Sequence, residues 1–198
     1  MPVSFFIPEK IKTAAGEISF DDVVKKLSEQ LTGISSNPKM GVGVLGAIQN
    51  ENTIARVNSA SSLGAKSILN SSQVKSEEFA NTRSVSPVLL ESGANDVTIY
   101  SKELFGPIAI CIRTKNTDES ISLAKEMAKQ HGAITCAAYS TDDDVIKKIT
   151  NMNMTKMLVG VATTAVGFAF GYWAYNKLLK ATPAAAPAPA PNPAQSKA

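Results

Sequence analysis

The stretch that decides the fold is residues 102–113, Lys102-Glu103-Leu104-Phe105-Gly106-Pro107-Ile108-Ala109-Ile110-Cys111-Ile112-Arg113. Its second half, 107–113, is a near-continuous apolar run, which is typical of a strand buried on both faces of a parallel sheet. An amphipathic segment at 119–130, headed by Asp118, predicts a helix, and another apolar run at 133–139 predicts a second strand. Strand, helix and strand in this order predict a crossover between parallel strands, so the predicted fold class is α/β.

The segments around this core carry further helix and strand patterns. Ser19 and Asp22 have the spacing of a capping box at the start of a helix over 17–31. The apolar stripe of that helix is Phe20, Val23, Val24, Leu27 and Leu31. Other helices are predicted at 50–63 and 142–149, and short strands at 65–69, 88–91 and 97–100. Together these elements predict one α/β domain over residues 1–150.

A different pattern near the C-terminus predicts a membrane span. Residues 157–175 contain no charged side chain, and the lysines that flank them are Lys156, Lys177 and Lys180. About 20 such residues cross the hydrocarbon core of a bilayer as a helix. We therefore expect one transmembrane helix with basic flanks within 151–180. Alternating alanine and proline after it predict a disordered, extended tail at 181–198.

Three glycines in the apolar segment, Gly160, Gly167 and Gly171, would share one face of such a helix. Small residues let two helices approach closely, so we expect this face to pack against a protein partner while lipid surrounds the rest. The N-terminus lacks the basic region and long apolar core of a secretory signal peptide. The C-terminal segment is therefore expected to direct the chain to a membrane as a single-pass protein, with an organellar, mitochondrial membrane favoured.

Composition excludes several classes of function. The chain has 198 residues and a formal net charge of +3, and no Lys/Arg-rich run suggests nucleic-acid binding. Its one histidine and two cysteines give no spacing typical of a metal site. Cys111 and Cys136 both fall in apolar runs, so we interpret them as buried thiols; a nucleophilic role would require a partner base.

Several segments, taken in order, resemble the aldehyde dehydrogenase superfamily over about residues 5–149. They are 38–41, 64–66, 86–91, the Glu-x-Phe-Gly-Pro motif within 102–107, and 131–135. The phrase at 131–135, with 139–142 after it, is most similar to the branch that acts in phenylacetic acid degradation. The resemblance implies a partial catalytic domain with a parallel βαβ core.

The resemblance also implies roles for two residues. In this family the motif's glutamate holds the nicotinamide ribose hydroxyls and its phenylalanine packs on the nicotinamide, roles that would fall on Glu103 and Phe105. The family's dinucleotide-binding domain, nucleophilic cysteine and general-base glutamate all precede the matched segment. Residues 1–4 stand where the nucleophile would be and contain no cysteine. We therefore expect no catalytic residue here, vestigial cofactor-binding residues and no bound cofactor.

Three hypotheses about function follow. The first is a non-catalytic, membrane-anchored structural or interaction subunit, whose partner binds the transmembrane glycine face or the surface that the missing domain would cover. The second is one part of a split aldehyde dehydrogenase that uses NAD(P) to oxidise an aldehyde to an acid. The third is a product of a pseudogene or of an incorrect gene structure, with no stable role.

Overall fold

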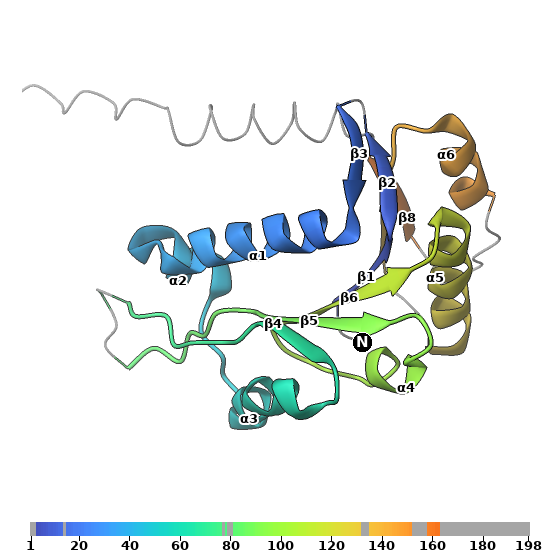
Figure 1. Ribbon diagram of the computed structural model, residues 1–198. Coiled ribbons are helices and arrows are strands. Elements are labelled where there is room, and N and C mark those ends of the chain that lie inside the picture. The colour runs from blue at the N-terminus through green and yellow to red at the C-terminus, as the bar shows by residue number, and fades with distance from the viewer. Residues whose placement is uncertain are drawn as a thin grey trace, which may run out of the picture.

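A four-stranded sheet forms the centre of the molecule. The computed structural model describes residues 3–13, 15–76, 78, 81–131, 135–151 and 158–162. Its sheet has the order β1 (Val3–Pro8), β6 (Ile108–Thr114), β5 (Val88–Gly93) and β4 (Lys66–Leu69). β1, β6 and β5 are parallel, and β4 joins one edge antiparallel to β5 (Figure 1). The predicted α/β class is thus confirmed, with a mixed rather than purely parallel sheet.

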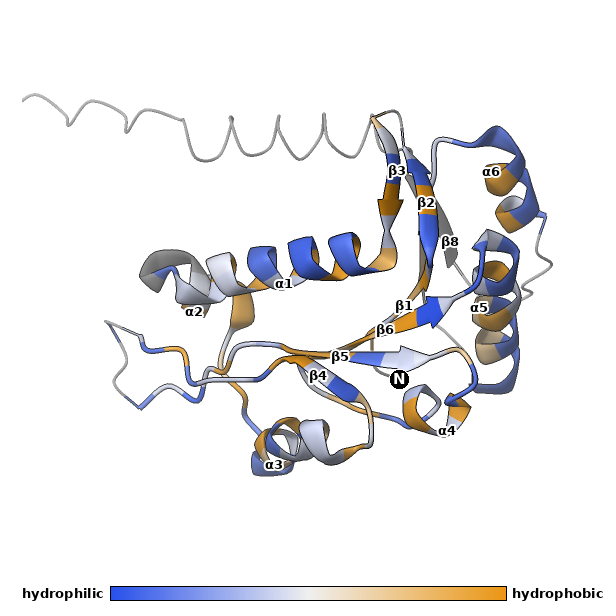
Figure 2. Ribbon diagram, in the orientation of Figure 1, coloured by the Kyte–Doolittle hydropathy of each residue, from blue (hydrophilic) through white to orange (hydrophobic). Residues whose placement is uncertain are grey.

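The central strand β6 is buried on both faces, as its apolar run predicts. On one face Ile108, Ile110 and Ile112 pack with residues of three helices on that side, Val57, Tyr100 and Met127. On the other face Cys111 and Leu89 pack against Phe20 and Val24 of the helix α1 (Phe20–Ser36). Figure 2 shows the apolar residues of α1 turned toward the sheet. Helices on both sides therefore exclude water from the middle strands.

The helices agree with the predicted pattern in most places. They are α1, α2 (Pro38–Leu45), α3 (Glu51–Ser59) with the short η1 (Ala60–Ser62), α4 (Val97–Tyr100), α5 (Thr117–His131) and α6 (Asp143–Thr150). The capping box of Ser19 and Asp22 at the start of α1 is confirmed. α1 runs past Gly33 to Ser36, and α2 was not predicted. Asn116 caps α5 in place of Asp118, since its Oδ1 accepts a hydrogen bond from the Glu119 amide at 2.9 Å.

The strand predicted at 97–100 is wrong, because these residues form α4. Val97, Ile99 and Tyr100 have high strand propensity, but tertiary contacts decide the conformation of so short a segment. The Tyr100 hydroxyl donates to the Ala94 carbonyl at 2.7 Å and its ring is buried against Phe6. The Asp96 carboxylate accepts from the Gly93 amide, which turns the chain directly after β5.

The remaining strands form two small pairs. β2 (Lys10–Thr13) and β3 (Gly16–Ser19) make an antiparallel hairpin before α1. β7 (Thr135–Tyr139) pairs in parallel with β8 (Leu158–Ala162), and α6 lies in the connection between them. The predicted crossover from β6 through α5 therefore reaches a strand as expected. Among the described residues, however, β7 pairs with β8 and not with β6.

β8 corrects the predicted transmembrane helix. The segment expected to be helical from 157 to 175 contains Leu158–Ala162, which is a strand, and Gly160 pairs with Ala137 of β7. A run of small and β-branched residues fits a buried strand as well as a membrane helix, and hydropathy alone does not separate the two. Within the described ranges no helix is long and apolar enough to span a bilayer. Gly167, Gly171 and the tail at 181–198 lie outside the described residues.

Candidate functional site

The candidate site lies at the edge of the sheet where the parallel strands begin. The register pairs Val3 of β1 with Ala109, and Val88 of β5 with Ile108. β1, β5 and β6 therefore start at the same edge. The loop at 101–107 leads into β6 at this edge, next to Val3, the first residue of β1. The Pro107 carbonyl accepts a hydrogen bond from the Val88 amide at 2.9 Å, which joins this loop to β5.

Side chains in the loop alternate between the core and solvent. Leu104 is only 6% exposed and belongs to the core beside β6. Glu103 is exposed, and Phe105 has 71% of its surface exposed. The two residues singled out by the family resemblance are thus both exposed on one loop, on either side of the buried Leu104. The Phe105 ring therefore presents apolar surface to solvent.

Two contacts with α3 hold the backbone of the loop. Arg56 donates from Nη1 to the Phe105 carbonyl at 2.7 Å. Gly106 has φ +145°, and a Cβ built there would lie 3.2 Å from Thr53 Cγ2 and 3.3 Å from Val57 Cγ2. A side chain at this position would be strained both by its backbone angle and by this close packing. The family resemblance singled out Glu103 and Phe105, whereas Arg56 gave no signal beyond its place on a predicted helix.

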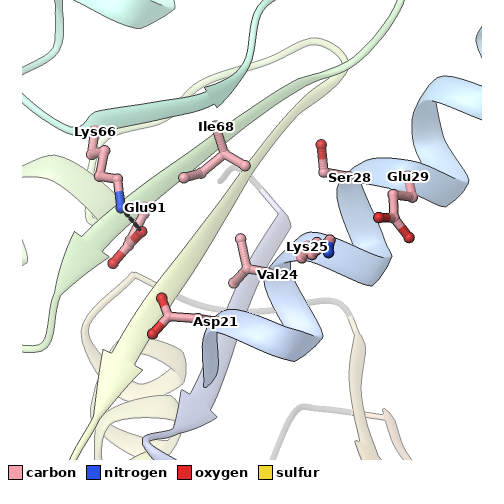
Figure 3. Close-up of a pocket in the computed structure, with 8 residues that line it drawn as sticks. All are labelled: Asp21, Val24, Lys25, Ser28, Glu29, Lys66, Ile68 and Glu91. Atoms are coloured by element: carbon pink, nitrogen blue, oxygen red, sulfur yellow. Dashed lines mark hydrogen bonds and ion pairs between the residues drawn. The ribbon is translucent and has the colours of Figure 1, made fainter. Parts of the chain in front are cut away.

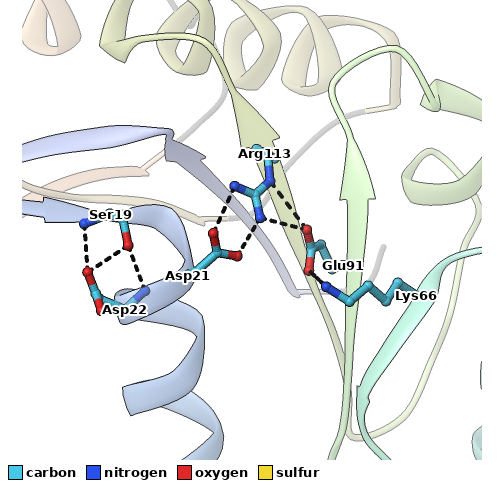
Figure 4. Close-up of polar contacts among 6 residues, drawn as sticks. All are labelled: Ser19, Asp21, Asp22, Lys66, Glu91 and Arg113. Atoms are coloured by element: carbon cyan, nitrogen blue, oxygen red, sulfur yellow. Dashed lines mark hydrogen bonds and ion pairs between the residues drawn. The ribbon is translucent and has the colours of Figure 1, made fainter.

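A row of ion-paired side chains on the face of the sheet that α1 covers joins α1 to β4, β5 and β6 (Figure 4). Arg113 contacts Asp21 at 2.6 Å and Glu91 at 2.9 Å, and Lys66 contacts Glu91 at 2.9 Å. The Arg113 guanidinium carbon also lies 3.9 Å from the centre of the Phe20 ring. Each of these charges has an opposite partner, so the row connects secondary-structure elements and offers no group poised for acid–base chemistry.

The pKa shifts in this row agree with that interpretation. Burial alone raises the pKa of Glu91, but hydrogen bonds from Lys66 and Arg113 outweigh it and leave the pKa below its ordinary value. The hydrogen bond from Arg113 lowers the pKa of Asp21 in the same way. The open groove beside these residues, between α1 and β4, is shown in Figure 3. It is lined by Asp21, Val24, Lys25, Ser28, Glu29, Lys66, Ile68 and Glu91.

We expect the ion-paired Glu91 to make stability depend on pH in acid. Because its pKa is lowered in the folded state, its stabilisation is complete above the ordinary value of 4.5 and is lost as the pH falls through the lowered folded value. Urea unfolding at a series of pH values below neutral measures this slope. Glu91→Gln should flatten it, and Lys66→Met, which removes one donor, should give an intermediate slope. A Glu91→Gln slope equal to that of the wild type would contradict the expectation.

Neither cysteine is suited to nucleophilic attack. Cys111 is fully buried, and burial raises the pKa of its thiol to about 12. Cys136 is half-buried in β7, and burial raises its pKa as well. Since the thiolate is the reactive form, a raised pKa disfavours nucleophilic attack by either thiol near neutral pH. The prediction of a buried thiol is confirmed for Cys111, whereas Cys136 is only half-buried. Within the described ranges no three potential metal-ligating side chains gather.

Comparison with known proteins places this chain in a family. The aldehyde dehydrogenase family signature matches residues 14–166, which extends past Ile149 and includes β8. Malonate-semialdehyde dehydrogenase of Listeria monocytogenes is 26% identical over 162 residues, covering 77% of this chain and 33% of its own length. Methylmalonate-semialdehyde/malonate-semialdehyde dehydrogenase [acylating], mitochondrial, of Rattus norvegicus is 24% identical over 96 residues, covering 48% of this chain and 17% of its own. These relatives correct the predicted phenylacetic acid branch.

Solved structures show the same relationship. An NAD-dependent aldehyde dehydrogenase from Burkholderia multivorans superimposes with a TM-score of 0.77 at 31% identity, over 81% of this chain and 29% of that chain. An NAD-dependent benzaldehyde dehydrogenase from Corynebacterium glutamicum shares the fold, with a TM-score of 0.55 at 18% identity over 80% of this chain and 31% of that one. The matched part of the chain thus spans only 17% to 33% of the length of these relatives. With the family signature over most of its length, this chain belongs to the aldehyde dehydrogenase family.

Proposed function

We propose that this chain supplies the nicotinamide-facing part of an NAD(P)-dependent aldehyde dehydrogenase that oxidises an aldehyde to an acid. The observation that carries the proposal is the exposure of Glu103 and Phe105 on one loop whose backbone is bound by Arg56 of α3. The relatives are dehydrogenases of semialdehydes and of benzaldehyde, and the similar enzyme from Burkholderia multivorans is an NAD-dependent aldehyde dehydrogenase. The membrane-anchored, non-catalytic subunit loses its main argument, because part of the expected transmembrane segment is β8.

The two loop residues fit one end of a nicotinamide dinucleotide. A carboxylate accepts hydrogen bonds from two hydroxyl groups, as the Glu103 side chain would from a ribose. A flat, exposed ring such as Phe105 packs on another flat ring, and covering it removes apolar surface from water. The bound cofactor would supply the hydride acceptor. The part of the chain that the structure describes offers no comparable set of groups for the phosphates, so we expect another domain to hold that end.

The start of β1 supports the same arrangement. Its parallel register with β6 places Val3, the first residue of β1, at the edge of the sheet where the loop at 101–107 enters β6. By the family resemblance, the nucleophile stands just before this strand. Cys111 and Cys136 are too buried and too weakly ionised to replace it. We therefore propose that polypeptide outside the described residues supplies the thiolate and the dinucleotide-binding domain, and that this polypeptide is the protein partner of the exposed loop.

Membrane contact and a mitochondrial location remain two separate proposals. Contact with lipid, and packing through Gly167 and Gly171, would rest on residues beyond 162. A mitochondrial location has support from the name of the Rattus norvegicus relative, which is given as mitochondrial. Neither proposal is needed for the function of the loop.

The test is enzymatic, on the assembly that contains the full-length chain. Purified under native conditions, this assembly should reduce NAD or NADP in the presence of an aldehyde, with malonate semialdehyde as the first substrate to try. Phe105→Ala should raise the KM for the cofactor about tenfold, which corresponds to about 1.4 kcal/mol of lost contact. Steady-state kinetics with the cofactor varied measures the effect.

Val44→Ala provides the matched control, because Val44 is also exposed, at 62%, but lies on α2. Its KM should equal that of the wild type. An assembly that oxidises no aldehyde with either cofactor would overturn the proposal. An unchanged cofactor KM in Phe105→Ala would remove the loop from the site.

A further inference from the structure

We infer that Arg56 is a positioning residue, which fixes the direction of Glu103 and Phe105 by binding the backbone between them and β6. The inference rests on the proposed function for its consequence in catalysis, but the contact itself is independent of that function. Arg56 lies 49 residues before Phe105 in the chain and is half-buried on α3. Its guanidinium donates to the carbonyl of the residue whose ring is exposed.

The loop is held at three successive positions by different means. The Leu104 side chain is buried in the core, the Phe105 carbonyl accepts from Arg56 at 2.7 Å, and Gly106 packs closely on Thr53 and Val57. The three α3 residues that contribute, Thr53, Arg56 and Val57, are spaced three and four apart and so share one helix face. Of these three contacts, only the Arg56 hydrogen bond is made to a backbone atom of Phe105 itself.

α3 is itself well fixed, so it can serve as a support. Its first turn is capped by Asn50, whose Oδ1 accepts from the Asn52 amide at 2.8 Å, and Val57 is 2% exposed in the core. Arg56 sits in the last turn, where a cation is favoured by the free carbonyl groups of the helix. A charged donor makes a stronger hydrogen bond to a carbonyl than a neutral one does. Without this bond, Leu104 and Gly106 would still be held, but the plane of the Phe105 peptide could turn.

A second arginine offers a matched control. Arg83 also donates to a backbone carbonyl, from Nη2 to Gln49 at 2.9 Å, and pairs with Glu51 at the start of α3. Replacing either arginine with methionine keeps an unbranched stem and removes the donor. A general effect of losing a surface arginine would appear in both variants, whereas the positioning effect should appear only in Arg56→Met.

The first measurement is ¹⁵N NMR relaxation of the full-length chain. In Arg56→Met, the backbone order parameters of residues 103–106 should fall from the rigid range of about 0.85 to below about 0.6, while β5, β6 and the urea midpoint stay close to wild type. Arg56→Lys, which keeps a donor, should restore part of this order. Arg83→Met should leave the order parameters of 103–106 unchanged. Equal order parameters in Arg56→Met and wild type would overturn the inference, whatever the loop binds.

The second measurement separates this inference from the proposed function. In the active assembly, Arg56→Met should raise the cofactor KM several-fold with a smaller change in kcat, and adding Phe105→Ala should not raise KM further. If Phe105→Ala raises KM and Arg56→Met does not, the positioning role in catalysis fails while the proposed function stands. If the assembly has no dehydrogenase activity, the proposed function fails, and the order parameters of the loop alone decide whether Arg56 positions it.

Discussion

Replacing Phe20 with alanine is expected to cost about 3–5 kcal/mol of the free energy of unfolding, the largest effect we expect from one substitution. Phe20 is fully buried as the first residue of α1 and packs with Val24, Leu89 and Cys111 against the sheet. Alanine would leave a cavity between helix and sheet and would remove the ring beneath the Arg113 guanidinium, 3.9 Å away. Urea unfolding of the full-length chain, followed by circular dichroism, measures the loss.

Phe20→Leu separates the two contributions. Leucine fills much of the cavity but offers no aromatic face to Arg113, so the cost should fall to about 1–2 kcal/mol. If leucine proves as costly as alanine, packing volume is not the main contribution of Phe20. A wild-type midpoint for Phe20→Ala would show that α1 does not need this contact to stay on the sheet.

Phe20 also illustrates what the sequence alone could predict. The apolar stripe from Phe20 to Leu31 and the capping box at Ser19 are local signals, and the structure confirms both. The strand at 107–113 was predicted from an apolar run that really is buried on two faces. Local patterns of this kind succeed because the same short segment both carries the signal and forms the element.

The errors have a common physical origin. No strand was predicted where β1 lies, and α4 was predicted as a strand; both elements are short. β8 is five residues of an apolar run that is long enough for a helix. In each case contacts with distant residues decide the conformation: β1 pairs with β6, and β8 with β7. Hydropathy reports that a segment avoids water, but not whether a neighbouring strand or a lipid covers it.

The site shows the same limit. The family resemblance identified Glu103 and Phe105, and the structure places both side chains in solvent on one loop. The support beneath the loop was not predicted, because Arg56 meets Phe105 across 49 residues and nothing in either local sequence indicates the contact. Such support is visible only once the helix and the loop are packed together.

Gly106→Ala is expected to destabilise the chain by about 2–4 kcal/mol and to displace the loop that carries Phe105. The φ angle of +145° is rarely adopted by residues with a Cβ and costs about 1–3 kcal/mol where it is forced. The added methyl group would also meet Thr53 and Val57 at 3.2 and 3.3 Å, and Val57 is fixed in the core. Because the backbone must move to relieve both strains, the cofactor KM of the active assembly should rise together with the loss of stability.

Gly33→Ala is the control, since it tests the same substitution where neither strain exists. Gly33 lies within α1, and a Cβ there would have nothing within 4 Å. Alanine should therefore stabilise the chain by about 0.5–1 kcal/mol and leave the cofactor KM unchanged. Unfolding in urea and steady-state kinetics of the two variants measure both effects. If the two glycines respond alike, the contact of Gly106 with α3 does not hold the loop, and the direction of Phe105 must depend on Leu104 and Arg56 alone.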